Sequence, residues 1–252
     1  MRSFFSSILA ALLPIAVFGT SPTETNLLTP ADKLPKATDS LSFDFSANIQ
    51  SRHVWRGTLT CSAWNVQPTV NLSKGNFLVG AWAANTFDSS YSEFDLYASY
   101  TIGGFTIALL DYFCPDETLA FNRLFDFNQQ TTQHTVDATL TYNGPDQFPI
   151  TIMASTLIWG DDLDHEGNNY FSTYIEAGYS HKPWVNTQFD IIAGFTTHNG
   201  YYAQGANMVN LGLQFEQPLL ISDNFSLPIF GKIHMNPYTE NIYFVFGFTL
   251  GS

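Results

Sequence analysis

Charged side chains are scarce in this sequence, and basic ones are the scarcest. Only 12% of the 252 residues are charged, against roughly 25% in an ordinary soluble domain. Nine Lys and Arg stand against 22 Asp and Glu, which gives a formal net charge of −13. Binding to nucleic acid requires a basic surface. We therefore expect no nucleic-acid partner, and a water-facing domain of this size would be expected to carry more charge.

Long apolar runs are also missing after residue 18. Residues 4–18 form one such run behind Arg2, but it is too short to cross a bilayer as a helix. We interpret residues 1–19 as a secretory signal peptide and the polar, proline-containing residues 20–40 as a disordered periplasmic leader. Removing the signal peptide takes away Arg2 and no acid, so the formal charge moves from −13 to −14. No later stretch approaches the ~20 apolar residues of a membrane helix, so a membrane location would require strands.

Motifs for metals, cofactors and catalysis are missing as well. The six His residues are scattered without a His-x₃-His pair, and there is no Gly-rich phosphate loop. Residues 161–167 form an acidic loop whose spaced oxygen ligands suit Ca²⁺, but an EF-hand would need a Glu where this chain has Thr173. We predict no metal site and no cofactor, and Ca²⁺ binding by this loop stays open.

No Ser–His–acid trio can be assigned from spacing, so we predict that the chain is not an enzyme. An outer-membrane hydrolase stays open as an alternative. Its candidate residues are His134 with Asp137, or the acids beside His165.

The sequence is rich in short segments that alternate apolar and polar residues. Between residues 92 and 102, Phe94, Leu96, Ala98, Tyr100 and Ile102 share one face, and a period of two is that of a β-strand. About twelve such strands are expected. Their predicted ranges are 41–56, 64–73, 76–87, 92–102, 105–114, 133–143, 148–159, 169–181, 187–197, 206–217, 225–236 and 240–250. Pro68 inside the second of them predicts a bulge, because it lacks an N–H for the ladder.

Connections between the predicted strands alternate between tight turns and longer loops. Lys74-Gly75 and Gly103-Gly104 are tight turns, whereas residues 115–132 form the longest loop. Aromatic residues gather near the short turns on the apolar face, as at a membrane interface. We therefore predict an all-β fold over residues 41–250, a twelve-stranded antiparallel transmembrane up-and-down β-barrel with both termini in the periplasm. A soluble or surface-attached β-sandwich adhesin is the alternative fold.

The chain also resembles a known family. The residues that carry the resemblance are Ser51-Arg52-His53-Val54-Trp55-Arg56-Gly57, Gln67-Pro68, Gly80-Ala81-Trp82-Ala83 and Glu93-Phe94-Asp95-Leu96-Tyr97. They are similar, in order and spacing, to the strand motifs of the TorF-type porins, a family of conserved outer-membrane proteins. The resemblance implies an outer-membrane barrel of a Gram-negative bacterium and a pore, and it supplies no catalytic residues.

In each predicted strand, the alternate positions that carry polar residues should face inward, and they predict the lining of that pore. The lining residues are Arg52, Arg56, Glu93, Asp95, Asp137, Glu176, Asp190, Glu216 and Lys232. With Asp44 added, seven inward acids stand against three bases, so the lumen should be negative and prefer cations. The function expected is passive passage of small hydrophilic solutes or cations, with outer-membrane lipid around the barrel. A non-conducting barrel in which acids and arginines pair with one another is the alternative.

Two further hypotheses concern the extracellular end. The loop 115–132 carries Phe121, Arg123, Phe125 and Phe127, and its apolar character suits a constriction that tucks into the lumen. Contact of this loop with a neighbouring protein is the alternative. Cys61 and Cys114 both fall on the oxidising side of the membrane, where a disulfide would pin the first loop across the mouth. Two free thiols are the alternative to that bond.

Overall fold

The computed structural model describes residues 40–116, 118–184, 186–222 and 225–251, and every regular element among them is a β-strand. The predicted signal peptide, and the predicted leader as far as residue 39, lie outside the described residues. The strands are β1 (Ser42–Gln50), β2 (His53–Trp55), β3 (Thr58–Cys61), β4 (Asn65–Lys74), β5 (Phe77–Thr86), β6 (Ser92–Ile102), β7 (Phe105–Phe113), β8 (His134–Asn143), β9 (Ile150–Gly160), β10 (Thr173–Trp184), β11 (Thr187–Thr196), β12 (Asn207–Ser222), β13 (Phe225–Asn236) and β14 (Asn241–Gly251). Within the described ranges, no helix is long and apolar enough to cross a membrane.

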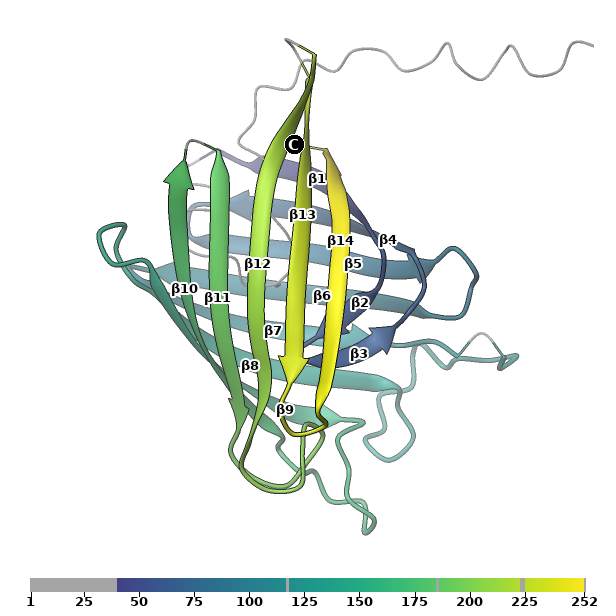
Figure 1. Cartoon of the computed structure of the whole chain (residues 1–252). Helices are drawn as coiled ribbons and strands as arrows, with labels where there is room; N and C mark the ends of the chain where they lie inside the picture. Colours follow the sequence, from purple (N-terminus) through teal and green to yellow (C-terminus); the bar gives the residue numbers. More distant parts are fainter. Residues whose placement is uncertain (1–39, 117, 185, 223–224, 252) are drawn as a thin grey trace, which may run out of the picture.

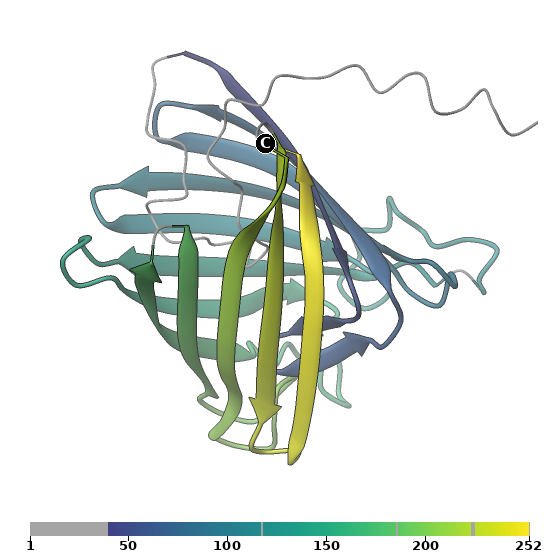
Figure 2. The ribbon, with the colours of Figure 1, turned by 45° about the horizontal axis from the view of Figure 1, so that its top comes forward.

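Twelve of these strands form one closed antiparallel barrel. Each of β4 to β14 pairs with its neighbour in sequence, and β1 closes the ring by pairing with both β4 and β14 (Figures 1 and 2). The remaining two strands, β2 and β3, pair only with each other. The predicted twelve-stranded all-β barrel is therefore confirmed.

The barrel wall is apolar outside and polar inside. On β7 the outward Phe105, Ile107 and Leu109 are 49%, 61% and 53% exposed. The inward-facing buried residues elsewhere include Asn48, Gln67, Asp95, Asp137 and Asn210. A soluble fold buries its apolar side chains and exposes its polar ones, so this wall has the reverse arrangement.

Pro68 does not cause the bulge that the sequence predicted. It pairs with Ala47 of β1, and the ladder to β5 stops at Val66 and resumes at Thr69 in the same register. The missing N–H therefore interrupts pairing on one side without adding a residue to the strand.

The first predicted strand, residues 41–56, is wrong in its second half. β1 ends at Gln50, and its five pairs with β14 join residues 46–50 to residues 247–251. Ser51 makes the last contacts with that wall, through its N–H to the carbonyl of Phe246 at 2.9 Å and through its Oγ, which accepts the N–H of Phe246 at 3.2 Å. Beyond Ser51 the chain leaves the wall, and this departure creates the site described next.

Candidate functional site

The chain that leaves the wall folds into a hairpin made of β2 and β3. Trp55 pairs with Thr58, so the connection is the two residues Arg56 and Gly57. Both have positive φ, 48° and 81°, as the tightest hairpin turns require. Residues 53–61, named the inner hairpin below, thus carry an arginine at their tip.

The tip of the inner hairpin reaches the inner faces of β12 and β13. Asn236 donates its side-chain amide to the carbonyl of Gly57 at 3.2 Å. Gly57 lies so close to β12 that a Cβ on it would stand 2.0 Å from the carbonyl oxygen of Val209. The tip of the hairpin therefore rests against β13 and β12, which stand two and three strands away from β1 around the barrel.

Arg56 is held by a buried carboxylate. Its Nη2 donates to Oδ2 of Asp137 at 2.8 Å, and its Nη1 donates to the hydroxyl of Tyr202 at 2.5 Å. Asp137 also accepts from Ser155 at 2.6 Å and from Tyr112 at 3.1 Å, and it is completely buried. Burial opposes the charge on Arg56, but Tyr202 and Asp137 outweigh it and hold the pKa of the guanidinium well above its ordinary value.

Aromatic rings surround this ion pair. The guanidinium of Arg56 lies 4.6 Å from the ring centre of Trp55 and 5.0 Å from that of Tyr174, which is cation–π distance. Trp55 in turn packs edge-on against Tyr112 at 5.4 Å and lies 5.8 Å from Tyr202. The hairpin tip therefore fills its part of the lumen with ordered, mutually packed groups.

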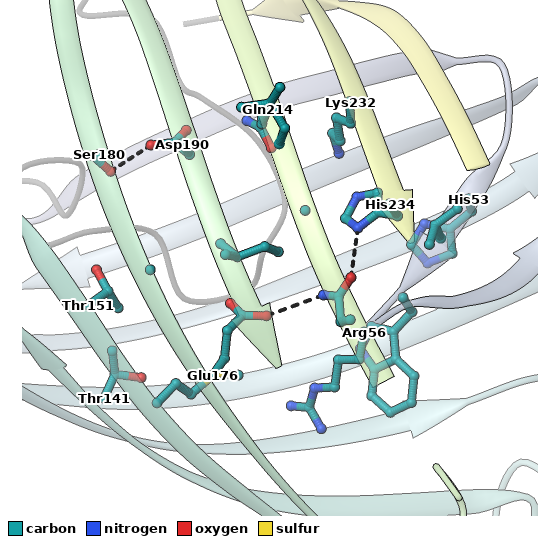
Figure 3. A pocket seen from close by; sticks show the side chains of 18 of the residues that line it. His53, Arg56, Thr141, Thr151, Glu176, Ser180, Asp190, Gln214, Lys232 and His234 are labelled. Carbon is teal, nitrogen blue, oxygen red and sulfur yellow. Dashed lines mark hydrogen bonds between the residues drawn. The ribbon is translucent and has the colours of Figure 1, made fainter. Parts of the chain in front are cut away.

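Beside the inner hairpin lies a cavity of about 130 Å³. Figure 3 shows the side chains of β10 to β13 that point into it. Glu176 accepts from Tyr174 at 2.5 Å and from Asn210 at 3.5 Å, and Asn210 in turn bonds His234 at 3.1 Å. The cavity has room for several waters and is smaller than the ~300–1,000 Å³ pockets that hold drug-sized ligands.

Six of the nine residues predicted to line a pore do line this cavity: Arg56, Glu93, Asp95, Glu176, Asp190 and Lys232. Three do not. Asp137 is covered by Arg56, Glu216 is buried in β12, and Arg52 lies in the short link between β1 and β2. The cavity lining thus holds four acids against two bases, and one of the bases is paired with Asp137.

The predicted constriction by the loop 115–132 is wrong. Phe121, Phe125 and Phe127 are 83%, 85% and 62% exposed, and neither they nor Arg123 line the cavity. The carbonyl of Leu124 instead accepts from His134 at 2.9 Å. His134 faces outward from β8, on the same side of the wall as Leu109 and Asp111 of β7. Its bond to Leu124 therefore holds the loop on the outside of the wall. The inner hairpin occupies the lumen that this loop was expected to narrow.

The expected disulfide is absent from the structure, in which Cys61 and Cys114 are both free. Cys61 ends β3 and is buried beside Asn65, whose Nδ2 lies 3.6 Å from its Sγ. Cys114 follows β7, with its Sγ 3.9 Å from the hydroxyl of Tyr91. The first loop folds inward as β3 instead of lying across the mouth, so it does not bring the two thiols together.

The acidic loop 161–167 uses its carboxylates on its own backbone. Asp164 accepts the N–H groups of Glu166 and Asn168 at 2.8 and 2.9 Å, and Asp162 accepts from Ser172. Among the residues that the structure describes, no three His, Cys, Asp or Glu side chains are grouped as a metal site would require.

Sequence reasoning missed the aromatic side of the site. Tyr112 and Tyr174 have the inward parity of their strands, so the alternation was a signal that could have placed them in the lumen. Tyr202 lies in the connection after β11 and gave no such signal. No family model matches the chain, and no curated protein matches it.

Proposed function

We propose that this protein is an outer-membrane channel of a Gram-negative bacterium that passes small solutes and prefers cations. The observation that carries the proposal is the polar, acid-rich lumen of a closed barrel with an apolar exterior. An apolar outer face suits lipid, and closure leaves no strand edge within a bilayer. The resemblance to TorF-type porins supports the same proposal, because its Val-Trp-Arg-Gly motif forms the tip of the inner hairpin, Val54 to Gly57.

The proposed selectivity follows from the charges on the cavity. Glu176 and Asp190 lie on one side of it, and Glu93 and Asp95 belong to β6. Arg56 is neutralised by Asp137, so Lys232 is left as the remaining basic residue of the lining. Rings of carboxylates draw cations into a channel. Partners of this function are membrane lipid and small hydrophilic cations.

A second candidate is a structural barrel that does not conduct. It is favoured by the inner hairpin, whose buried Arg56–Asp137 pair and packed aromatic rings occupy the lumen. The hydrolase alternative loses one candidate pair. His134 and Asp137 are three residues apart on β8, so they face opposite sides of the wall.

The experiment is a planar-bilayer recording of purified protein under a KCl gradient. We expect the reversal potential of the wild type to lie on the K⁺ side and that of Glu176→Gln to move toward zero. Asp146→Asn, in an exposed turn outside the lumen, is the matched control and should leave the potential unchanged. A wild-type reversal potential at zero or on the Cl⁻ side would contradict the cation preference.

A deletion separates the two candidates. Replacing residues 54–59 by two glycines removes the hairpin tip while keeping the wall strands. A silent wild type with a conducting deletion variant would establish the plugged, structural barrel. If neither conducts, although both are folded and inserted, the channel proposal is wrong.

A further inference from the structure

The loop between β7 and β8 is tied to the outer face of the barrel wall. His134 of β8 bridges two groups there: its Nδ1 lies 3.0 Å from the carboxylate of Asp111, and its Nε2 lies 2.9 Å from the carbonyl of Leu124. Asp111 follows Ile107 and Leu109 on the outward parity of β7. The ring of Phe127 stacks on His134 at 5.2 Å. Figures 1 and 2 show this teal loop running outside the barrel.

The same loop displays apolar side chains that nothing in the described protein covers. Residues 119–127, named the aromatic segment below, include Phe121 and Phe125, which are 83% and 85% exposed. Between them stands Arg123, whose side chain is 66% exposed and lies 3.6 Å from Asp126. Large apolar rings around an arginine are the composition of a membrane interface, where rings enter the acyl boundary and the guanidinium meets phosphate.

The point at which the aromatic segment is attached to the wall, relative to the apolar row of β7, indicates which kind of surface covers its rings. Phe105, Ile107 and Leu109 form an exposed apolar row on β7, and Asp111 is the first polar residue of that row toward the extracellular end. A charged residue on the outward face marks the edge of the apolar band. The aromatic segment is fastened at Asp111 through His134, so its point of attachment lies at the edge of that band, which is the headgroup level of a surrounding bilayer.

We infer that the aromatic segment inserts Phe121 and Phe125 into the headgroup–acyl boundary of the outer leaflet and so anchors the extracellular rim of the barrel to lipid. The inference rests on the proposed membrane location and adds to it a lipid contact made by a loop. Burial of each ring removes apolar area that is otherwise exposed to water. The ligand class is a lipid surface, with a phosphate-bearing headgroup for Arg123.

The test is site-directed spin labelling in vesicles of phosphatidylcholine and phosphatidylglycerol. Single cysteines replace Phe121 or Phe125 in the full chain with Cys61→Ser and Cys114→Ser. Leu109→Cys on the wall and Glu166→Cys in the exposed acidic loop are the lipid and water controls. We expect labels at 121 and 125 to collide with oxygen more than with a water-soluble nickel chelate, as at 109 and opposite to 166.

Each contrary outcome has its own meaning. A water-like label at 109 would contradict the membrane location itself. A lipid-like label at 109 with water-like labels at 121 and 125 would overturn this inference alone. A label at 121 or 125 that is shielded from both reagents, and whose spectrum is broadened by the same label on another molecule, would show that a second copy covers the segment and would overturn the inference too.

Discussion

At the scale of single residues, the contact between Arg56 and Asp137 decides how the lumen is filled. Asp137 receives hydrogen bonds from Arg56, Ser155, Tyr112 and Thr139, so its carboxylate is satisfied on every side. Buried ion pairs are stabilising only when their remaining groups are bonded in this way. Removing one partner would leave the other charged and enclosed, which is more costly than losing the pair.

Asp137→Ala should therefore lower the free energy of unfolding by about 3–5 kcal/mol, since it strands the Arg56 guanidinium among aromatic rings. Urea unfolding in lipid vesicles, followed by tryptophan fluorescence, measures the change. Asp146→Ala in an exposed turn is the control and should stay within about 0.5 kcal/mol of the wild type. The double variant Arg56→Met with Asp137→Leu should regain part of the loss. Equal stabilities of Asp137→Ala and the control would show that the pair is not enclosed.

At the scale of elements, the inner hairpin is the part of the chain that departs from barrel regularity. Its two-residue turn places Arg56 and Gly57 at positive φ, and the tip rests on Val209 of β12 and Asn236 of β13. Gly75, in the turn between β4 and β5, also has a positive φ of 58°, but a Cβ there would meet nothing within 4 Å. The two glycines thus share a backbone conformation and differ in what lies beside them.

Gly57→Ala should destabilise the protein more than Gly75→Ala does. Left-handed backbone alone costs alanine about 1–2 kcal/mol at either site, while at Gly57 the new methyl also collides with the Val209 carbonyl, 2.0 Å away. The hairpin must then lift from β12, so conductance in a planar bilayer should rise for Gly57→Ala and stay unchanged for Gly75→Ala. Identical effects of the two substitutions on stability and conductance would mean that the tip does not rest on β12.

At the scale of the whole molecule, the reversed distribution of apolar and polar residues governs which solvent the barrel tolerates. Ile107 on the outer face is 61% exposed and stands four residues before Asp111 on β7, whereas Thr151 of β9 lines the cavity. In the proposed membrane location, the same charged substitution therefore meets lipid at one position and a polar lumen at the other.

Ile107→Arg should cost about 2–4 kcal/mol in vesicle-inserted protein, the penalty for a basic residue deep in the lipid. Thr151→Arg should cost much less, because it faces a cavity lined by Glu176 and Asp190 (Figure 3). Unfolding titrations of both variants in the same vesicles make the comparison. A penalty that is larger for Thr151→Arg would place water outside the barrel and contradict the membrane location.

Local sequence determined the wall of this protein. Alternation with a period of two fixes which face each strand presents, and short Gly-containing turns force antiparallel neighbours, so twelve strands and a closed antiparallel barrel followed without the tertiary structure. Parity also placed Glu93, Asp95, Glu176, Asp190 and Lys232 in the lumen. It further separates His134 from Asp137, because residues an odd number apart on one strand face opposite sides.

Only the tertiary structure decided where two segments go after they leave the wall. Arg52 and Arg56 keep the polar parity of β1, as in a continuing wall strand. What turns the inner hairpin away from the wall is a set of partners distant in sequence, Asp137, Tyr202 and Asn236. The aromatic segment is likewise apolar enough for the lumen or for lipid, and His134 holds it outside. In both segments local pattern fits either location, because the free energy that separates them lies in contacts that form only when the barrel closes.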